Sequence, residues 1–276
     1  MERSKFVFVA AVLFSCLAQL ALAGSISITV TATTSVFSDN GIVNITLQNN
    51  GDEAAEDVRV SLLLSEDFTS DMVVIGRLFP GVPWSGSIFV NTTDNLLPGA
   101  YPAVILTQYR DANGYPFSSV SKNSIVYKEI SYSDISSKIN DNKKVELSDN
   151  GKIFMTLWNQ GDSAIDAKIR LYMPLEIKAN EYEKYIHLDS KEEKELEFKI
   201  SNFGALAGSS YFVLSAIEYD GDKHYTSFAS GIVEIKEKAE IAGLETSWLI
   251  FLLIALIIIF SLYQFKGRIR WKKNTK

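Results

Sequence analysis

The sequence of 276 residues predicts an all-β chain of two tandem β-sandwiches, followed by a single C-terminal transmembrane α-helix. Three observations predict this organisation: an internal repeat of domain size, alternation of apolar and polar residues, and turn-forming dipeptides between the alternating runs.

The internal repeat has a spacing of 110 residues, from position 38 to position 148. Ser38–Gly41 recurs as Ser148–Gly151, and Asn49–Asp52 recurs as Asn159–Asp162 with one change. Three tyrosines keep the same offset: Tyr101, Tyr109 and Tyr115 recur as Tyr211, Tyr219 and Tyr225. A fixed period of this length indicates duplication of a whole folding unit, because solenoid repeats are much shorter.

The local hydrophobic pattern is that of β-strands. Apolar residues alternate with polar ones from Val43 to Leu47, and they recur from Ile153 to Leu157. Period-two alternation predicts strands with one buried and one solvated face. Further strands are expected at 58–64 and 167–173, 87–90 and 195–200, and 101–109 and 211–219. The offset between equivalent residues falls to 109 for the strands at 58–64 and 167–173. We assign this change to a loop that is one residue shorter in the second copy.

Turn-forming residues separate these runs. Positive-φ hairpin turns are expected at Asn-Gly and Asp-Gly pairs, and Pro-Gly steps mark further turns. The pairs are Asn40-Gly41, Asn50-Gly51, Asn113-Gly114, Asn150-Gly151, Asp220-Gly221, Pro80-Gly81 and Pro98-Gly99. Several short strands in about 100 residues favour immunoglobulin-like β-sandwiches. We predict domain 1 at 24–129 and domain 2 at 130–237, which abut without a flexible linker.

A family resemblance adds to this pattern. Gly41–Asp52 followed by Val58–Leu62 resembles the strand, N-x-G-D turn and strand that open CARDB and NEW3 adhesion-type modules. Ile75–Leu78, the two Pro-Gly steps and Tyr109–Gly114 are similar to an S-layer-type repeat of archaeal cell surfaces. Domain 2 lacks both Pro-Gly steps and is a diverged copy. The resemblance implies an extracellular, non-catalytic, often membrane-tethered sandwich, and it implies no ligand.

The first 23 residues have the composition of a secretory signal peptide. Arg3 and Lys5 precede an apolar stretch, and Ala21-Leu22-Ala23 supplies a cleavage site, so the mature chain is expected to begin at Gly24. An alternative interpretation is a lipobox around Cys16, although Phe14 is bulky for that motif. Cys16 is the single cysteine, so the mature chain is expected to hold no disulfide.

Residues 246–265 carry no charge and predict one membrane span. Twenty residues at about 1.5 Å each span about 30 Å, the thickness of a bilayer core. Trp248 and Tyr263 are placed as interfacial anchors. A stalk at 238–245 precedes the span, and a basic tail at 266–276 follows it. The tail's cations predict a cytoplasmic C-terminus: Lys266, Arg268, Arg270, Lys272, Lys273 and Lys276.

The charge of the exported part argues against nucleic-acid partners. Without the tail and the signal peptide, 19 of the 27 basic and 32 of the 33 acidic residues remain, a net charge of about −13. Such a surface repels phosphate backbones. We therefore expect the membrane bilayer, envelope proteins and cell-surface glycans as partners, and the oligomeric state is open.

Residues that could carry chemistry are few. The two histidines, His187 and His224, lack a cysteine or paired carboxylate at ligand spacing, and His224 is expected in a solvated turn. Asp111–Gly114 lacks the downstream glutamate of an EF-hand and fits a hairpin better than a calcium loop. No hydrolase, metalloprotease or nucleotide-binding motif occurs. The sequence therefore predicts a protein that is not an enzyme, with no cofactor and no metal.

Four residues are candidates for modification or binding on the outer faces. Asn44 and Asn91 begin Asn-x-Thr sequons; Asn44 is expected to face outwards, and Asn91 is expected in a polar segment after a strand. Phe154 and Trp158 occupy the outward positions that Asn44 and Gln48 hold in domain 1, so they are candidate partner contacts. Packing on domain 1, a loop or neighbouring strands is the alternative. Trp84 is expected to be a loop aromatic.

The predicted function is a non-enzymatic cell-surface protein, anchored by one span with its ectodomain outside, that binds envelope proteins or glycans. The alternative is an accessory subunit of a transporter or secretion complex, in which the span packs on partner helices. Leu249–Phe260 contains one small residue, Ala255, and close helix packing favours small residues. The span therefore resembles a lipid-facing anchor, which favours the first interpretation.

Overall fold

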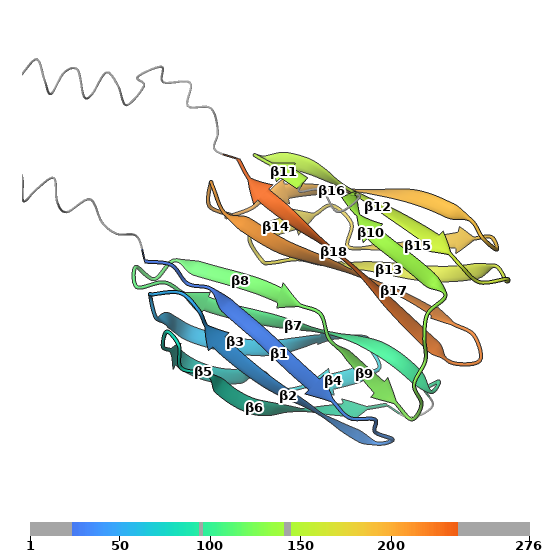
Figure 1. Cartoon of the computed structure of the whole chain (residues 1–276), viewed down its shortest axis with the longest axis horizontal. Helices are drawn as coiled ribbons and strands as arrows, with labels where there is room; N and C mark the ends of the chain where they lie inside the picture. The colour runs from blue at the N-terminus through green and yellow to red at the C-terminus, as the bar shows by residue number, and fades with distance from the viewer. Residues whose placement is uncertain (1–23, 94–95, 141–144, 237–276) are drawn as a thin grey trace, which may run out of the picture. The chain divides into compact units, whose positions relative to one another are not determined.

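The computed structural model describes residues 24–93, 96–140 and 145–236. These residues form eighteen β-strands (Figure 1). Among them, no helix is long and apolar enough to cross a membrane. The predicted signal peptide, stalk, span and tail, with Trp248, Tyr263 and the six tail cations, lie outside the described residues. The all-β prediction is confirmed for the part of the chain that the structure describes.

Nine strands form the first repeat, which we call repeat 1. One of its sheets has the order β1-β2-β6-β4, and the other contains β5, β3 and β7, with β8 and β9 paired to β7. The strands are β1 (Ile28–Thr34), β2 (Asn40–Asn49), β3 (Ala55–Leu64), β4 (Phe68–Ser70), β5 (Val73–Leu78), β6 (Trp84–Thr92), β7 (Gly99–Arg110), β8 (Pro116–Ser121) and β9 (Ser124–Tyr127).

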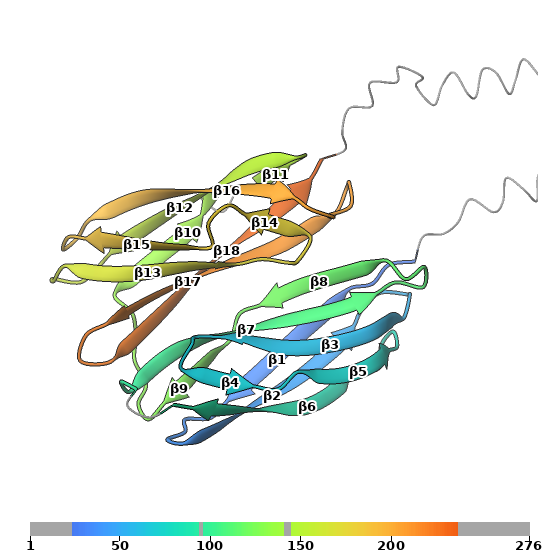
Figure 2. The ribbon, with the colours of Figure 1, turned by 180° about the vertical axis from the view of Figure 1, so that it is seen from behind.

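The other nine strands form repeat 2 with the same topology. One sheet has the order β10-β12-β16-β14, and the other has the order β15-β13-β17-β18, with β11 paired to β18 (Figure 2). Strand β18 also pairs with β7, which joins this second sheet and β7-β3-β5 of repeat 1 into one ten-stranded sheet. The strands are β10 (Ile135–Ile139), β11 (Val145–Leu147), β12 (Asn150–Asn159), β13 (Ile165–Tyr172), β14 (Ile177–Ala179), β15 (Glu183–Leu188), β16 (Glu193–Asn202), β17 (Ser210–Asp220) and β18 (His224–Ile235).

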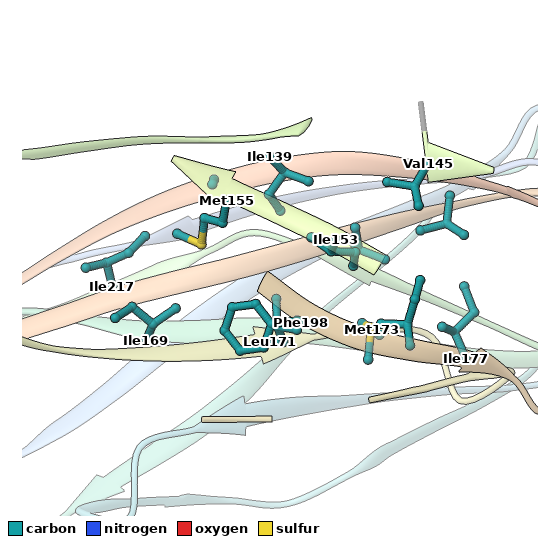
Figure 3. Packing of buried hydrophobic residues seen from close by; sticks show 14 of the residues in the cluster. Ile139, Val145, Ile153, Met155, Ile169, Leu171, Met173, Ile177, Phe198 and Ile217 are labelled. Carbon is teal, nitrogen blue, oxygen red and sulfur yellow. The ribbon is translucent and has the colours of Figure 1, made fainter. Parts of the chain in front are cut away.

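Each repeat has its own hydrophobic core between two facing sheets. In repeat 2, Ile153 and Met155 of β12 point towards Ile169 and Leu171 of β13, and Phe198 of β16 fills the same layer (Figure 3). All five side chains are at most 2 % exposed. The alternation of the sequence therefore corresponds to inward and outward positions, as in an immunoglobulin-like sandwich.

A buried asparagine at the end of β2 and of β12 explains the repeated N-x-G-D pattern. Asn49 Nδ2 donates to the carbonyl of Glu53 at 2.7 Å, and its Oδ1 accepts from the amide of Gly51 at 3.0 Å. Asn159 makes the same bonds to Ser163 and Gly161, at 2.8 and 3.0 Å. Both side chains are fully buried. In both copies of the N-x-G-D motif, the asparagine side chain thus stabilises the loop that follows the strand, and the glycine of the motif does not have a positive φ.

The structure corrects two expectations about backbone geometry. Gly41 and Gly151 lie within β2 and β12 and not at positive φ; Gly41 instead packs closely on the ring of Phe37. The extra residue of repeat 1 lies in a bulge of β3 and not in a loop: the pairing of β3 shifts at Ala55–Arg59, where Asp57 has φ +50°. A bulge absorbs one residue without changing the flanking alternation, so the pattern alone could not locate it.

The two repeats contact each other through equivalent positions. The small cluster between them contains Val104 and Leu106 of β7 with Leu214 and Ala216 of β17, and these two pairs are related by the repeat spacing of 110. Strand β7 contacts β18, while β17 contacts β8. Because β7 is equivalent to β17 and β8 to part of β18, each repeat uses the same strands for this contact. Two equal units packed about an approximate two-fold axis produce this pattern.

Gly99 lies at the point where the repeats come closest. It pairs with His224 at the start of β18, and its φ is +152°. A Cβ atom there would lie 2.0 Å from the carbonyl oxygen of His224. The amide of His224 donates to the carbonyl of Pro98 at 2.9 Å. The Pro98-Gly99 step therefore serves a close backbone approach between repeats, and repeat 2 has no corresponding need for it.

Candidate functional sites

The outer face of β12 carries the two predicted contact aromatics. Phe154 is 38 % exposed and Trp158 is 46 % exposed, with Thr156 between them. Their cross-strand partners on β16 are Glu197 and Glu193. Both rings therefore lie on a sheet surface beside a row of carboxylates. The prediction that these side chains face outwards is confirmed, whereas their role as partner contacts stays a prediction.

The matching face of repeat 1 is polar at the same positions. Asn44 is exposed, and its Oδ1 accepts a hydrogen bond from Ser87 Oγ at 2.7 Å. Asn91 is also exposed but lies within β6, where it pairs with Asn40 of β2 and Thr69 of β4. The expectation of a segment after the strand is therefore wrong, because pairing with both β2 and β4 includes Asn91 in β6, which ends at Thr92. Use of either sequon stays a prediction.

Trp84 is also a strand residue and not a loop aromatic. It begins β6 opposite Leu47 and packs against the core of repeat 1. Its ring lies over Gly86, where a Cβ atom would approach the indole within 2.3 Å. Asp111–Gly114 forms the expected turn: Asp111 Oδ1 accepts from the amides of Asn113 and Tyr115 at 2.9 and 2.7 Å. That carboxylate thus stabilises its own turn.

Two crevices flank the apolar contact between the repeats. The larger one encloses about 780 Å³, and we call it the acidic crevice. Repeat 1 contributes Glu66, Asp67 and Tyr101 to its lining, and repeat 2 contributes two segments around its histidines. Its ionisable and aromatic residues are Glu66, Asp67, Tyr101, Asp166, Lys168, Tyr185, His187, Glu218, Tyr219, Asp220 and His224.

His224 lies inside this crevice and not in a solvated turn, which corrects the sequence-based expectation. Its side chain is 12 % exposed, and its ring stacks on Tyr101 with centroids 3.8 Å apart and planes 3° apart. Its Nδ1 lies 2.7 Å from Asp220 Oδ1, and its Nε2 lies 3.4 Å from Glu218 Oε1. The paired carboxylates were missed because Glu218 and Asp220 come two residues apart on the preceding strand.

The electrostatics of the acidic crevice follow from this packing. Burial lowers the pKa of His224, but Glu218 and Asp220 raise it by more, so the net pKa lies above its ordinary value of 6.5. Burial, reinforced by Asp220, raises the pKa of Tyr101. Glu218 is itself buried, and its Oε1 accepts from Ser65 Oγ of repeat 1 at 3.0 Å. The crevice thus buries two ionisable side chains of repeat 2 against Ser65 and Tyr101 of repeat 1.

His187 lies on the exposed rim of the same crevice. Its Nδ1 is 2.7 Å from Asp166 Oδ1, and its Nε2 is 3.5 Å from Asp189 Oδ1. The hydrogen bond that His187 donates to the Asp166 carboxylate is the main cause that raises the pKa of His187. Each histidine therefore has carboxylate neighbours that linear spacing did not reveal. Within the described ranges, no group of three or more His, Cys, Asp or Glu side chains is placed to hold a metal ion.

The second crevice encloses about 340 Å³, and we call it the aromatic crevice. Part of its lining is equivalent to that of the acidic crevice, with the roles of the repeats exchanged. Arg59 and Arg110 correspond to Lys168 and Asp220. Its principal lining residues are Asp57, Arg59, Tyr109, Arg110, Tyr115, Phe117, Leu175, Glu176 and Phe203.

Glu176 is the buried acid of the aromatic crevice. Ser118 Oγ of repeat 1 donates to Glu176 Oε2 at 2.6 Å and accepts from the amide of Leu175 at 2.7 Å. Burial raises the pKa of Glu176 above its ordinary value of 4.5, and the hydrogen bond from Ser118 opposes that rise. Tyr115 adds a third contact, from its hydroxyl to the carbonyl of Gly204 at 2.5 Å.

Comparison with known proteins finds solved structures that resemble this chain only weakly. No family model matches the chain, and no curated protein matches its sequence. Native E. coli alpha-2-macroglobulin is similar to it at 9 % identity and a TM-score of 0.30, over 75 % of this chain and 17 % of that one. Red sea bream transglutaminase is similar at 9 % identity and a TM-score of 0.27, over 76 % of this chain and 31 % of the enzyme.

A smaller solved domain is similar to about one repeat. This is a PapD-like domain of human CEP192, at 11 % identity and a TM-score of 0.27, over 39 % of this chain and 89 % of that domain. The chain thus spans less than a third of the two larger proteins. The sandwich assignment rests on the strand pairing described above.

Proposed function

We propose that this protein is a non-enzymatic cell-surface protein, anchored by its predicted C-terminal span, whose two immunoglobulin-like repeats bind an envelope protein or glycan. Its resemblance to membrane-tethered adhesion-type modules supports this proposal, as do its predicted signal peptide and span. The observation that carries the binding role is the pair of exposed aromatic side chains, Phe154 and Trp158, on the outer face of β12.

The chemistry around the pair suits a partner with hydrogen-bond donors. The two residues are four positions apart on one strand, so their Cα atoms are separated by about 13 Å. Glu193 and Glu197 lie opposite them, and Glu197 forms an ion pair with Lys152 at 2.9 Å. Exposed aromatic rings with carboxylate acceptors alongside can bind sugar hydroxyls or basic and apolar side chains of a protein.

The test is photo-crosslinking from Thr156, which lies between the two aromatics, in the full chain within the cells that make it. Thr46 is the matched control, because it holds the equivalent position of repeat 1 between Asn44 and Gln48. We expect a specific adduct from position 156 that is absent at position 46. The double substitution Phe154→Ala and Trp158→Ala removes two exposed anchors, and a loss of about 2 kcal/mol or more in binding is expected if they are hot spots.

The adduct's identity separates the alternatives. An envelope protein supports the proposal, and so does a glycan whose retention is lost in the double variant. Equal labelling from positions 46 and 156 would contradict the assigned face. A polytopic membrane protein captured in stoichiometric amount, with labelling unaffected by the double substitution, would favour the accessory-subunit alternative.

A further inference from the structure

Four exposed apolar side chains occupy two loops, which we call the apolar loops. The first loop follows β5 and presents Phe79 and Val82, which are 52 and 57 % exposed. The second follows β16 and presents Phe203 and Leu206, which are 66 and 40 % exposed. Single exposed apolar residues are common, but four of them on two loop tips indicate a surface that becomes buried in an interaction.

Hydrogen bonds connect the first loop to the second. Gly81 donates to the carbonyl of Asn49 at 2.8 Å, and Asn49 bonds the carbonyl of Glu53. Glu53 Oε1 accepts from the amide of Ala112 at 2.7 Å, in the turn that also carries Tyr115. The hydroxyl of Tyr115 then donates to Gly204 in the second loop. The apolar loops therefore lie at the same end of the described unit.

The described chain leaves the fold at that same end. Gly208 of the second loop donates to the carbonyl of Ile235 at 2.8 Å, and Ile235 donates back to Ser209 at 2.9 Å. Figure 1 shows the end of β18 beside the loop that follows β16 in repeat 2. Lys236 is the next residue and the last one described. Residues 237–245 then separate it from the predicted span, a tether of about 30 Å when fully extended.

A cation accompanies the aromatic ring on each loop. Lys178 Nζ lies 3.1 Å from the centroid of the Phe203 ring, and Arg77 Cζ lies 5.6 Å from that of Phe79. Aromatic rings combined with Lys or Arg are typical of side chains that enter the interfacial region of a bilayer, where the ring lies among the lipids and the cation near phosphate groups.

The equivalent loop of the other repeat lacks these features. Residues 79–83 of repeat 1 read Phe-Pro-Gly-Val-Pro, whereas residues 189–193 of repeat 2 read Asp-Ser-Lys-Glu-Glu. The second set lies at the opposite end, beside the rim residue His187 of the acidic crevice. The apolar character is therefore confined to the copy of this loop that lies at the end with Lys236, and it is not a requirement of the fold.

From these observations we propose that the apolar loops are a lipid-binding surface, which docks the ectodomain onto the bilayer that holds its own predicted span. This inference rests on the anchoring proposed above. A short tether keeps the loops at an effective concentration of about millimolar near the membrane, so weak insertion is sufficient for docking. The rings would enter by about 5–10 Å, the usual depth of interfacial side chains. Docking would fix which outer faces remain available to partners.

The test uses the full chain reconstituted into phosphatidylcholine vesicles that contain doxyl-labelled phosphatidylcholine as a quencher. Because the only native cysteine lies in the predicted signal peptide, Val82→Cys, Leu206→Cys and Tyr132→Cys each give one site for an environment-sensitive fluorophore. Tyr132 is 83 % exposed and adjoins Ser131, which bonds His224 at the other end of the unit, so it is the matched control.

We expect lipid quenching at positions 82 and 206 and none at position 132. Adding Phe79→Asp and Phe203→Asp should abolish that quenching while the protein still floats with the vesicles. Equal quenching at all three positions in protein that floats would overturn the lipid-binding surface alone. Chain that does not float would overturn the proposed anchoring and this inference together. Quenching that disappears when the protein is diluted in the vesicles would overturn the lipid-binding surface and indicate that the apolar loops contact a second copy.

Discussion

The acidic and aromatic crevices occupy equivalent positions on either side of one apolar contact, yet their side chains differ in kind. The acidic crevice places His224 and Asp220 where the aromatic crevice has Pro116 and Arg110, because each pair is the last cross-strand pair of its hairpin. Between them, the contact itself uses equivalent apolar residues from both repeats, such as Val104 and Leu214. The packing of the duplicated units therefore depends on the apolar centre, whereas the side chains of the two crevices differ between the copies.

Each crevice also buries one glutamate that bonds a serine of the other repeat, but the two acids are held differently. Glu176 depends on Ser118, which also satisfies the amide of Leu175. Glu218 has Ser65 and, in addition, the imidazole of His224. A buried carboxyl group that has one side-chain partner is more sensitive to loss of that side chain than a carboxyl group that has two.

The largest effect is expected from a charge in the shared apolar centre. Leu214→Asp and its counterpart Val104→Asp each bury an unpaired carboxylate on a face outside the two main cores. Each should weaken the contact between repeats by about 3–5 kcal/mol and leave both sandwiches folded. Limited proteolysis of the connecting segment 128–134 measures this. An effect at one position alone would show that the two repeats do not contribute equally to the contact.

A smaller effect is expected from the two serines. Ser118→Ala removes a donor to Glu176 and an acceptor for Leu175, so a loss of about 1–3 kcal/mol is expected. Ser65→Ala should cost less, because Glu218 keeps His224. Thermal unfolding of the two variants at one pH measures the difference. If Ser65→Ala is the more destabilising, His224 does not support Glu218 and the account of the acidic crevice is wrong.

The smallest effect is a pH dependence that differs between the crevices. The folded-state pKa of His224 is raised above 6.5, so its stabilisation is complete below that value and is lost as pH rises through the folded pKa. The pKa of Glu176 is also raised, from 4.5, so the folded state binds more protons and stability falls as pH rises above that value. The two losses therefore begin at different pH values, and both have the same sign.

Two substitutions assign these losses. His224→Phe keeps a ring against Tyr101 without a titrating group and should remove the loss that begins near 6.5. Glu176→Gln should remove the loss that begins near 4.5. Melting temperature against pH for the three proteins is the measurement. An unchanged profile in His224→Phe would show that another group causes the upper loss.

Much of the fold could be predicted from the sequence because it depends on local patterns. Alternation at Val43–Leu47 and Ile153–Leu157 located the core strands, and the same pattern placed Phe154 and Trp158 outside. Non-local effects escaped prediction. The bulge at Asp57 leaves the alternation intact on both sides, and Asn91 belongs to a strand because β2 and β4 both pair with it.

The crevices could not be predicted for the same reason. The stack of His224 on Tyr101 joins residues more than one hundred positions apart, across a contact that no local pattern marks. One signal was available in the sequence. Aligning the repeats places Gln108 and Arg110 against Glu218 and Asp220. This change from a neutral and a basic residue to two acids indicates that a surface shared by the two copies has diverged.

The exchanged packing of β7 on β18 and of β17 on β8 has a consequence for assembly. Two identical modules that meet in this way form an isologous pair, in which each patch is satisfied by its counterpart and growth stops at two. Here both modules belong to one polypeptide, so the pair is closed by covalent connection. The self-complementary patch is therefore buried within the molecule. Other partners bind at the outward sheet faces and the loop tips.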